Sequence, residues 1–301
     1  MPGSPYTGST LLGLLLDDHP ACASIGAATG LIRRADLSTY RCSCGALFRE
    51  CRFWNAVADR TRALGYPVDV FKTDFWNTHL RLSHNRIINA LLVRSLGSER
   101  LTEIRDLLVG NLGSVRREIA AAGWNTWSLA TAVLEQTGKT VFVDSARDHQ
   151  RPKYLAMHPM LDVKVIHLIR DPRGNTASIM KHTGLDVATA ARRWTRYNKE
   201  AARVRRYLPA ESWMSLHYED LCADPHGVLD QISDFLGVER ADMSNDFQRN
   251  EHHIIGNSMR LKRLSEIRED RSWQTKLGHA ELSVIGRIAG PTSRHLGFSW
   301  P

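Results

Sequence analysis

Hydrophobic positions divide the first half of the chain into helical segments. The leucine-rich residues 9–18 predict a helix that ends at Pro20. Residues 55–137 repeat apolar side chains at three- and four-residue spacing, which predicts a mostly helical region, and Gly138 provides a helix stop. Between these two regions, residues 40–54 form a cysteine-rich segment that we expect to be a loop.

Strand and helix signals alternate after this helical region. Short apolar runs predict strands at 141–144, 163–169 and 213–218. Asp171-Pro172 and Asp224-Pro225 each place an N-cap residue before a proline, which predicts two helix starts, and residues 188–208 read as a long basic helix. This alternation predicts an α/β fold with a parallel sheet and helices on both faces.

The segment Gly3–Thr10 reads G-S-P-Y-T-G-S-T and has the spacing of a phosphate-binding loop, with Ser9 where nucleotide triphosphatases carry lysine. Backbone N–H groups and the helix dipole favour an anion at such a turn. The missing lysine argues against ATP or GTP hydrolysis. A strand is expected before the loop, yet only Met1 and Pro2 precede Gly3, so either the strand lies outside this chain as written or the interpretation of the loop is wrong.

A second anion-binding segment is predicted at Ile169–Ser178, which reads I-R-D-P-R-G-N-T-A-S. Arg170 follows a predicted parallel strand, and ligands bind at the carboxyl ends of such strands. Ser178 lies on the helix that comes next. A guanidinium and a hydroxyl in this arrangement can hold one phosphate together, although a surface Arg–Asp pair with a helix cap would give the same sequence.

Several motifs in this order resemble bacterial sulfotransferases that use 3′-phosphoadenosine 5′-phosphosulfate (PAPS). They are P-x-x-G-S-T-L-L near the start, V-F-V-D-S-A-R at Val141–Arg147, R-D-P-R…S at Arg170–Ser178, Y-E-D-L…F-L-G from Tyr218 to Gly237, and G-N-S-M-R at Gly256–Arg260. The C-x-C-G…C-x-F-W stretch also occurs in bacterial members. The resemblance covers nearly the whole chain.

The resemblance implies a P-loop-like three-layer α/β fold with a central parallel sheet, built as a single domain over residues 1–301. It also implies a helical acceptor-side insertion at 52–137 and a nucleotide-closing segment at 250–275. Donor-binding residues are then expected at Tyr6, Thr7, Gly8, Ser9, Thr10, Leu11, Arg170, Ser178, Tyr218, Gly256, Asn257 and Arg260. The first group would hold the 5′-phosphosulfate, Arg170, Ser178 and the late segment the 3′-phosphate, and Tyr218 would approach the adenine.

Two departures from the family pattern bear on catalysis. Where relatives carry Arg or Lys in the loop, this chain has Tyr6-Thr7, so we expect Arg147 to supply the cation unless it only pairs with a neighbouring Asp. Where many relatives carry a glutamate base, this chain has Ala27, which has no proton-accepting atom. Asp144 and three histidines are then the candidate bases, and the histidines are His19, His84 and His149.

The cysteines of the 40–54 loop leave three alternatives open. Cys42, Cys44 and Cys51 could bind zinc with a fourth ligand, form a disulfide, or simply pack in the loop. The C-x-C spacing is not one of the common zinc spacings. Sulfuryl transfer itself is expected to need no metal, since no β- and γ-phosphate oxygens have to be bridged.

Composition limits the classes of partner that the chain is expected to bind. The 301 residues carry a net charge of +8, which suits an anionic donor, while the scattered charges and the lack of any nucleic-acid module argue against DNA or RNA. No apolar run spans a membrane and the cysteines do not suggest a secreted framework, so a cytoplasmic enzyme is expected. The predicted acceptor is a small molecule or glycan with a hydroxyl. The alternatives are a P-loop small-molecule kinase and a PAPS-binding protein with impaired catalysis.

Overall fold

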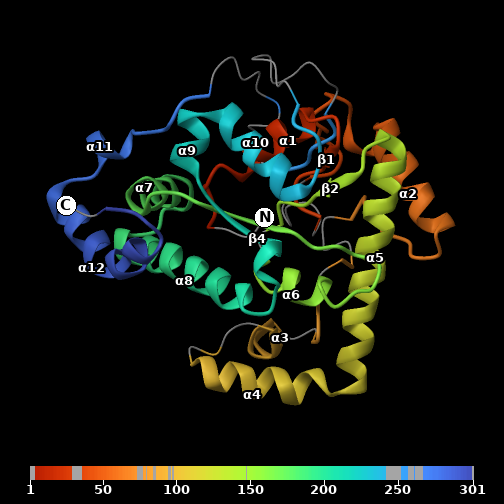
Figure 1. Cartoon of the computed structure of the whole chain (residues 1–301), viewed down its shortest axis with the longest axis horizontal. Helices are drawn as coiled ribbons and strands as arrows, with labels where there is room; N and C mark the ends of the chain where they lie inside the picture. The colour runs from red at the N-terminus through yellow and green to blue at the C-terminus, as the bar shows by residue number, and fades with distance from the viewer. Residues whose placement is uncertain are drawn as a thin grey trace.

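The computed structural model contains helices and short parallel strands (Figure 1). It describes residues 4–28, 36–72, 77–78, 80–83, 86–93, 96, 98–146, 148–241, 252–256, 261 and 267–299. The strands are β1 (Cys22–Ser24), β2 (Val141–Val143), β3 (Val165–Ile169) and β4 (Trp213–His217). The helices are α1 (Ser9–Asp18), α2 (Arg52–Ala63), α3 (Arg86–Val93), α4 (Glu99–Gly110), α5 (Gly113–Thr137), α6 (Arg151–Leu155), α7 (Pro172–Thr183), α8 (Val187–Arg205), α9 (Tyr218–Ala223), α10 (Pro225–Leu236), α11 (Trp273–Lys276) and α12 (His279–His295), with 3-10 turns η1 (Phe48–Glu50) and η2 (Ala210–Ser212).

The four strands form two parallel pairs. In the first pair, Cys22 lies opposite Val141, and in the second, Val165 lies opposite Trp213. All five residues of β3 are buried, as expected for a parallel strand covered on both faces. The parallel pairing confirms the α/β class, whereas a single central sheet in a P-loop-like three-layer fold stays a prediction.

One hydrophobic core joins both strand pairs. Leu12 and Leu15 of α1 pack in the same buried cluster as Val143 of β2, Ile166 of β3 and Ile232 of α10. These side chains are almost completely removed from water, and burial of this kind is the main force that holds α/β layers together. The core therefore fixes the N-terminal helix against both pairs of strands.

Local sequence signals predicted the helix ends. The Asp171 side chain accepts a hydrogen bond from Arg173 N at the start of α7, and the Asp224 side chain accepts one from Gly227 N at the start of α10. Gly138 ends α5 in the left-handed region with φ of 68°. Strand β1 was not predicted, because three residues are too few to show a periodicity.

Helices α2 to α5 build the predicted helical region, with α3 and α4 at the bottom of the view and the long α5 rising along its right side (Figure 1). Trp54 of α2 is fully buried beside Val57, so this tryptophan packs in the core. On α3 and α4, apolar side chains such as Ile87 and Leu107 are exposed. This region thus carries apolar surface away from the strands.

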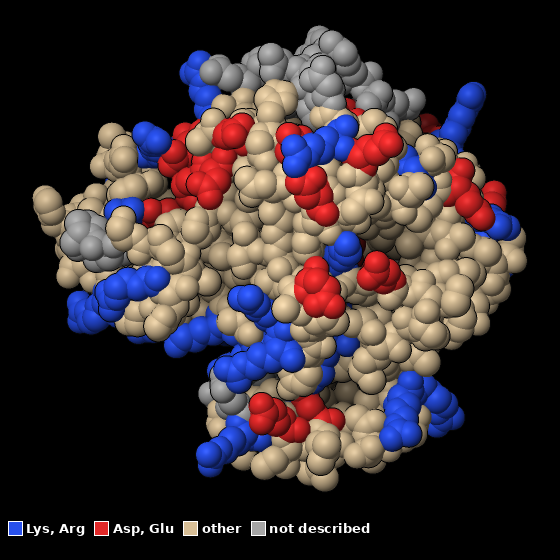
Figure 2. Space-filling model, in the orientation of Figure 1, with Lys and Arg blue, Asp and Glu red and all other residues tan. Residues whose placement is uncertain are grey.

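Basic side chains gather over α8 in Figure 2, on the lower part of this face, beside a notch that separates the main body from α3 and α4. The sequence of α8 carries five arginines, and Asp186 caps the helix by accepting from Thr189 N. Among the described helices, none is both long and apolar enough to cross a bilayer.

Candidate functional site

The N-terminal loop enters α1 through two residues with positive φ. Tyr6 has φ of 65° and Gly8, the N-cap of α1, has φ of 93°. A left-handed non-glycine residue such as Tyr6 is strained, and such strain collects at ligand-binding loops. The first turn of an α-helix presents N–H groups that the helix itself does not use, so the end of this loop and the start of α1 offer backbone donors to an anion.

Asn175 of α7 anchors this loop through two hydrogen bonds. Its amide Nδ2 donates to Pro5 O at 2.8 Å, and its Oδ1 accepts from Ser4 Oγ at 2.8 Å. Thr7 Oγ1 donates back to Ser4 O at 3.1 Å. All four residues are buried, so the loop is held in place by satisfied polar contacts rather than by apolar packing alone.

Arg170 joins the N-terminal loop to α7. It follows the last residue of β3, and its guanidinium donates to Tyr6 O at 3.1 Å and to Ser178 Oγ at 3.2 Å. The two segments that the sequence marked as anion sites therefore meet at one side chain, although Tyr6 and Arg170 lie 164 residues apart. Arg170 is only 6% exposed, so water screens its positive charge only weakly at this point.

Tyr218 closes the other side of this arginine. The Arg170 guanidinium lies 4.7 Å from the centre of the Tyr218 ring, within the range of a cation–π contact. The same ring fills the space beside Gly8, where a Cβ atom would approach Tyr218 Cδ2 to 2.6 Å. Any side chain at position 8 would clash with this ring. The positive φ of Gly8 would also be strained for a residue with a Cβ atom. Burial raises the pKa of Tyr218, so its hydroxyl stays protonated.

Asp270 occupies the solvent side of Arg170. Both its backbone carbonyl, at 2.9 Å, and its Oδ2, at 3.3 Å, accept from the Arg170 guanidinium. Its N–H donates to the Tyr218 hydroxyl at 3.3 Å. A carboxylate thus lies beside the arginine where a phosphate is expected, and this contact lies within the predicted closing segment 250–275.

The predicted catalytic positions Ala27 and Asp144 follow β1 and β2 at the same edge. Strand β1 runs back along α1, since Cys22 N bonds His19 O and Ser24 lies beside Gly13. Ala28 N donates to Asp144 Oδ1 at 2.8 Å, which brings the two strand ends together. Ala27 is half-buried.

Asp144 has both carboxylate oxygens engaged. Oδ1 also accepts from Ala146 N at 2.8 Å, and Oδ2 accepts from Arg151 Nε at 3.0 Å. Arg151 is buried and also donates to Thr78 O and, at 3.2 Å, to Thr126 Oγ1. These contacts favour an orienting role for Asp144, and its role as a base stays a prediction. Arg147 lies outside the described residues.

The late G-N-S-M-R segment is described only at its first residue. Gly256 N donates to the Tyr40 hydroxyl at 3.0 Å, whereas Asn257 and Arg260 lie outside the described residues. Just before it, Ile255 N donates to Ile25 O at 3.0 Å, and Ile255 O passes so close to Gly26 that a Cβ there would lie 2.0 Å away. Ile255 therefore lies beside the residues that lead to Ala27.

Of the candidate histidines, His19 lies at the far end of α1 from the loop, where it is buried next to Glu239 O and Ser233 Oγ. His149 is buried beside Tyr197, and burial lowers its pKa to about 3. His84 lies outside the described residues. The position of His19 argues against a role at the loop, whereas His149 follows β2 and stays a candidate base.

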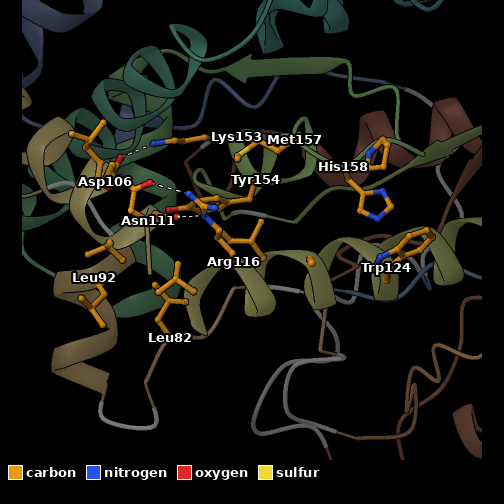
Figure 3. Close-up of a pocket in the computed structure, with 17 residues that line it drawn as sticks. Leu82, Leu92, Asp106, Asn111, Arg116, Trp124, Lys153, Tyr154, Met157 and His158 are labelled. Carbon is orange, nitrogen blue, oxygen red and sulfur yellow. Dashed lines mark hydrogen bonds and ion pairs between the residues drawn. The ribbon is translucent and has the colours of Figure 1, made fainter. Parts of the chain in front are cut away.

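A cavity of about 540 Å³ lies between α4, α5 and α6 (Figure 3). Its lining is mostly apolar and includes Leu82, Leu92, Val115, Ile119, Trp124, Met157 and Pro159. Charged and amide groups gather at one end, where Lys153 Nζ bonds Asp106 Oδ2 at 2.6 Å and Arg116 bonds Asn111 Oδ1 at 2.9 Å, and His158 lines the other end (Figure 3). Lys153 lies two residues after Arg151, so α6 connects the cavity to Asp144.

Sequence reasoning missed several residues that build the site. Asn175 lay inside the R-D-P-R-G-N segment, and its position on the buried face of α7 was the available signal. Glu219 accepts from Asp171 N at 2.9 Å, and burial raises the pKa of its carboxyl. Arg151 and Asp270 gave no clear local signal. Thr126, a further partner of Arg151, lies 25 residues away, and Arg170, the partner of Asp270, lies 100 residues away.

Comparisons with known proteins agree with these motifs. A family model described as the sulfotransferase family matches residues 2–242. The sulfotransferase domain from the curacin biosynthetic pathway is 18% identical, with a TM-score of 0.51 over 100% of this chain and 99% of that chain. The sulfotransferase domain from the Synechococcus PCC 7002 olefin synthase is 21% identical, with a TM-score of 0.51 over 99% and 94%. Curated proteins give no match. The two structural neighbours share the fold with this chain.

Proposed function

The chain belongs to the sulfotransferase family, and we propose that it moves a sulfuryl group from PAPS to the hydroxyl of an acceptor. The observation that carries this proposal is the position of Arg170, whose guanidinium reaches both Tyr6 O of the N-terminal loop and Ser178 Oγ of α7. PAPS carries a phosphosulfate on the 5′ oxygen and a phosphate on the 3′ oxygen of its ribose, so it needs two anion sites built around one nucleoside.

The N-terminal loop is proposed to hold the 5′-phosphosulfate. Backbone N–H groups of residues 6–11 supply donors there, and α1 adds the positive end of its dipole. Because these donors belong to the backbone, the site does not need the lysine that Ser9 replaces. Asn175 acts as a positioning residue, since it fixes Ser4 and Pro5 at the base of the loop.

The 3′-phosphate is proposed to bind at Arg170 and Ser178, with Asn257 and Arg260 completing this site from the closing segment. In the described structure Asp270 accepts from Arg170, so the incoming phosphate would replace this carboxylate. Tyr218 supports Arg170 through its ring and is proposed to lie against the adenine side of the nucleotide.

In the proposed reaction the acceptor oxygen attacks the sulfur in line with the bond to the 5′-phosphate oxygen. The new S–O bond forms as the old one breaks, the acceptor proton leaves to a base, and adenosine 3′,5′-bisphosphate departs with the bonding electrons. Catalysis then rests on positioning and on stabilising negative charge at the departing phosphate. We assign the latter task to the loop N–H groups and to Arg147.

The proton acceptor is the part of the proposed machinery that departs furthest from the family pattern, because Ala27 stands where a glutamate base is expected. Asp144 lies next to it in space through the Ala28 N–H bond, and His149 follows five residues later. A chain in which neither serves would bind PAPS and transfer slowly, which is the impaired-enzyme alternative.

The acceptor is proposed to enter through the cavity between α4, α5 and α6. Its lining is mostly apolar, with Lys153, Asp106 and Arg116 on one side. This lining favours a small-molecule alcohol with an apolar body over a glycan, since a glycan would leave many hydroxyls without partners. The helical region 52–137 is thus proposed as the acceptor-side cover of one domain.

We also place the enzyme in the cytoplasm. None of the five cysteines forms a disulfide in the structure, although Cys44 Sγ and Cys51 Sγ lie only 3.7 Å apart. Proteins of oxidising compartments tend to use such pairs as disulfides.

The donor half of this proposal is tested by calorimetric titration of the protein with adenosine 3′,5′-bisphosphate and with ATP. We expect binding of the bisphosphate at least ten times tighter than binding of ATP, by about 1.4 kcal/mol. Equal or tighter ATP binding would contradict the proposed donor and favour the kinase alternative.

The acceptor half is tested by incubating the protein with labelled PAPS and a series of alcohols, and by mass spectrometry of the products. We expect the yield of sulfated product to rise with the apolar length of the alcohol until the cavity is filled. Tight bisphosphate binding without any sulfated product would identify the chain as the impaired-enzyme alternative.

A further inference from the structure

Four metal-binding side chains from two distant parts of the chain converge beside β1. Cys42, Cys44 and Cys51 come from the cysteine-rich loop, and His253 comes from the segment 252–256. Their sulfur and nitrogen atoms all lie within 4.8 Å of one another. Cys51 and His253 are 202 residues apart in the sequence, so this meeting is a product of the fold.

Three of the six donor–donor distances match the edges of a tetrahedron around zinc, and all six lie within 4.8 Å. With Zn–S bonds of about 2.3 Å and Zn–N bonds of about 2.0–2.1 Å, tetrahedral angles place two sulfurs about 3.8 Å apart and a sulfur about 3.6 Å from the nitrogen. Here Cys44 Sγ lies 3.7 Å from Cys51 Sγ, and His253 Nδ1 lies 3.6 Å from Cys42 Sγ and 3.5 Å from Cys51 Sγ.

The backbone presents these side chains as a preformed site. Cys42 N donates to Ala46 O at 3.0 Å and Gly45 N donates to Cys42 O at 3.0 Å, which makes a tight turn with Gly45 at φ of 89°. Ser43 extends from this turn to His253. Its hydroxyl donates to His252 O at 2.6 Å and accepts from Ile254 N at 2.8 Å, so it holds both neighbours of the histidine.

The histidine ring is also oriented from outside the cluster. The Phe53 ring stacks on it with a centroid distance of 4.3 Å and an interplanar angle of 3°. Cys42 and Cys51 are almost fully buried, whereas Cys44 and His253 are half-buried. An ion at the centre of the four donors would therefore be largely shielded from water.

We propose that Cys42, Cys44, Cys51 and His253 form a structural zinc site. Three thiolates and one imidazole are a common structural ligand set, and four protein ligands leave no open position for a substrate. A disulfide would join only two of the three thiols and would leave the histidine unexplained. The proposal is independent of the donor and the acceptor of the enzyme.

The site would fasten the segment 252–256 to the cysteine-rich loop. Gly256 follows three residues after His253 and bonds the Tyr40 hydroxyl, two residues before Cys42. Zinc would thus fix Gly256, the last described residue of this segment. It would position the start of the proposed closing segment without touching the reacting atoms.

The test uses the full chain, without a histidine tag, purified from zinc-containing medium under reducing conditions. Elemental analysis is expected to find about one zinc per chain, and X-ray absorption to find about three sulfurs at about 2.3 Å and one nitrogen at about 2.0 Å. Replacement by cobalt is expected to give the strong visible bands of a tetrahedral thiolate site. These readouts need no variant.

Two variants and a matched control sharpen the test. Cys44→Ser is expected to lose most of the zinc, whereas His253→Cys keeps it as a four-thiolate site with shifted cobalt bands. Cys222→Ser, outside the cluster, is expected to keep the zinc content of the parent. Any one of three results would overturn the proposal. The protein could contain no zinc after purification in zinc medium, it could contain a disulfide among the three cysteines, or its zinc could have no sulfur ligands.

Discussion

Asn175 Oδ1 accepts a hydrogen bond from Ser4 Oγ at 2.8 Å, across 171 residues of sequence. The same side chain donates to Pro5 O, and its exposed fraction is 0%. One buried amide therefore fixes the base of the N-terminal loop. Since the loop is proposed to bind the phosphosulfate through its backbone, its affinity for the donor depends on this contact.

We expect Asn175→Ala to lower the affinity for adenosine 3′,5′-bisphosphate about tenfold, because Ser4 Oγ and Pro5 O lose their buried partner and the loop loses its geometry. Calorimetric titration measures this change. Asn198→Ala is the matched control. Asn198 is another buried asparagine, which bonds Trp194 O and lies near His167. Equal losses in both variants would show a general stability effect and contradict the positioning role.

Arg170→Lys tests the fork geometry of the guanidinium. Lysine keeps the charge but cannot donate to Tyr6 O and Ser178 Oγ in fixed directions, so we expect bisphosphate affinity to fall by about 10- to 100-fold. Arg240→Lys is the control, since Arg240 forms an exposed pair with Asp234 away from this site. Unchanged binding by Arg170→Lys would remove Arg170 from the proposed 3′-phosphate site.

Asp270→Asn is expected to act in the opposite direction. Asp270 Oδ2 lies 3.3 Å from Arg170, so its carboxylate competes with an incoming phosphate for the same donor. We expect severalfold tighter bisphosphate binding in the variant, and a smaller gain at high salt because charge interactions are then screened. Asp234→Asn provides the control. A loss of affinity in Asp270→Asn would mean that this carboxylate supports the site instead.

Sequence patterns predicted the parts of the fold that depend on neighbouring residues. The caps at Asp171 and Asp224 and the stop at Gly138 are local, because a few consecutive residues decide whether a helix can begin or end. The apolar run of β3 is likewise readable from its own composition. These signals were sufficient for the α/β class and for the order of the strands and helices from β2 onward, but they did not predict β1.

The remaining parts depend on contacts between distant segments. The bonds of Asn175 to the loop and the meeting of His253 with Cys51 cross more than half of the chain, so no spacing rule could predict them. Arg151 and Asp144 are only seven residues apart, yet the role of Arg151 follows from its further bond to Thr126 Oγ1 on α5. The sequence predicted candidate anion-binding residues and missed those that hold them in place.

Stability is expected to fall as the pH drops below about 6.5, partly through His167. This histidine is buried in β3 beside Asn198, and burial lowers its pKa to about 4. The unfolded chain takes up a proton at about pH 6.5, whereas the folded protein does so only near pH 4, so acid favours unfolding between these values by on the order of 1 kcal/mol per pH unit.

Urea unfolding at pH 7 and pH 5 measures this effect. His167→Gln removes the titrating group, so its free energy of unfolding is expected to change less between the two pH values than that of the parent. His279→Gln, at the exposed start of α12, should keep the parent slope. A parent-like slope in His167→Gln would assign the acid sensitivity to other groups, with buried His149 the next to test.

Ala27→Glu tests whether the missing carboxylate limits turnover. Ala27 follows β1 and precedes Ala28, whose N–H bonds Asp144 Oδ1, so a glutamate here enters the edge where the strand ends meet. A positioned general base contributes about 100-fold or more, and we expect a gain in kcat of this order with bisphosphate affinity nearly unchanged. Labelled PAPS and a productive alcohol provide the assay.

Ala27→Gln is the matched control, because glutamine has the size of glutamate but cannot accept the proton at neutral pH. We expect it to show no gain in turnover. If both variants gain equally, the effect comes from packing at the end of β1. If neither gains while both bind the bisphosphate, the proton leaves through another group, and Asp144→Asn and His149→Gln become the decisive pair, since each removes one remaining acceptor on the residues that follow β2.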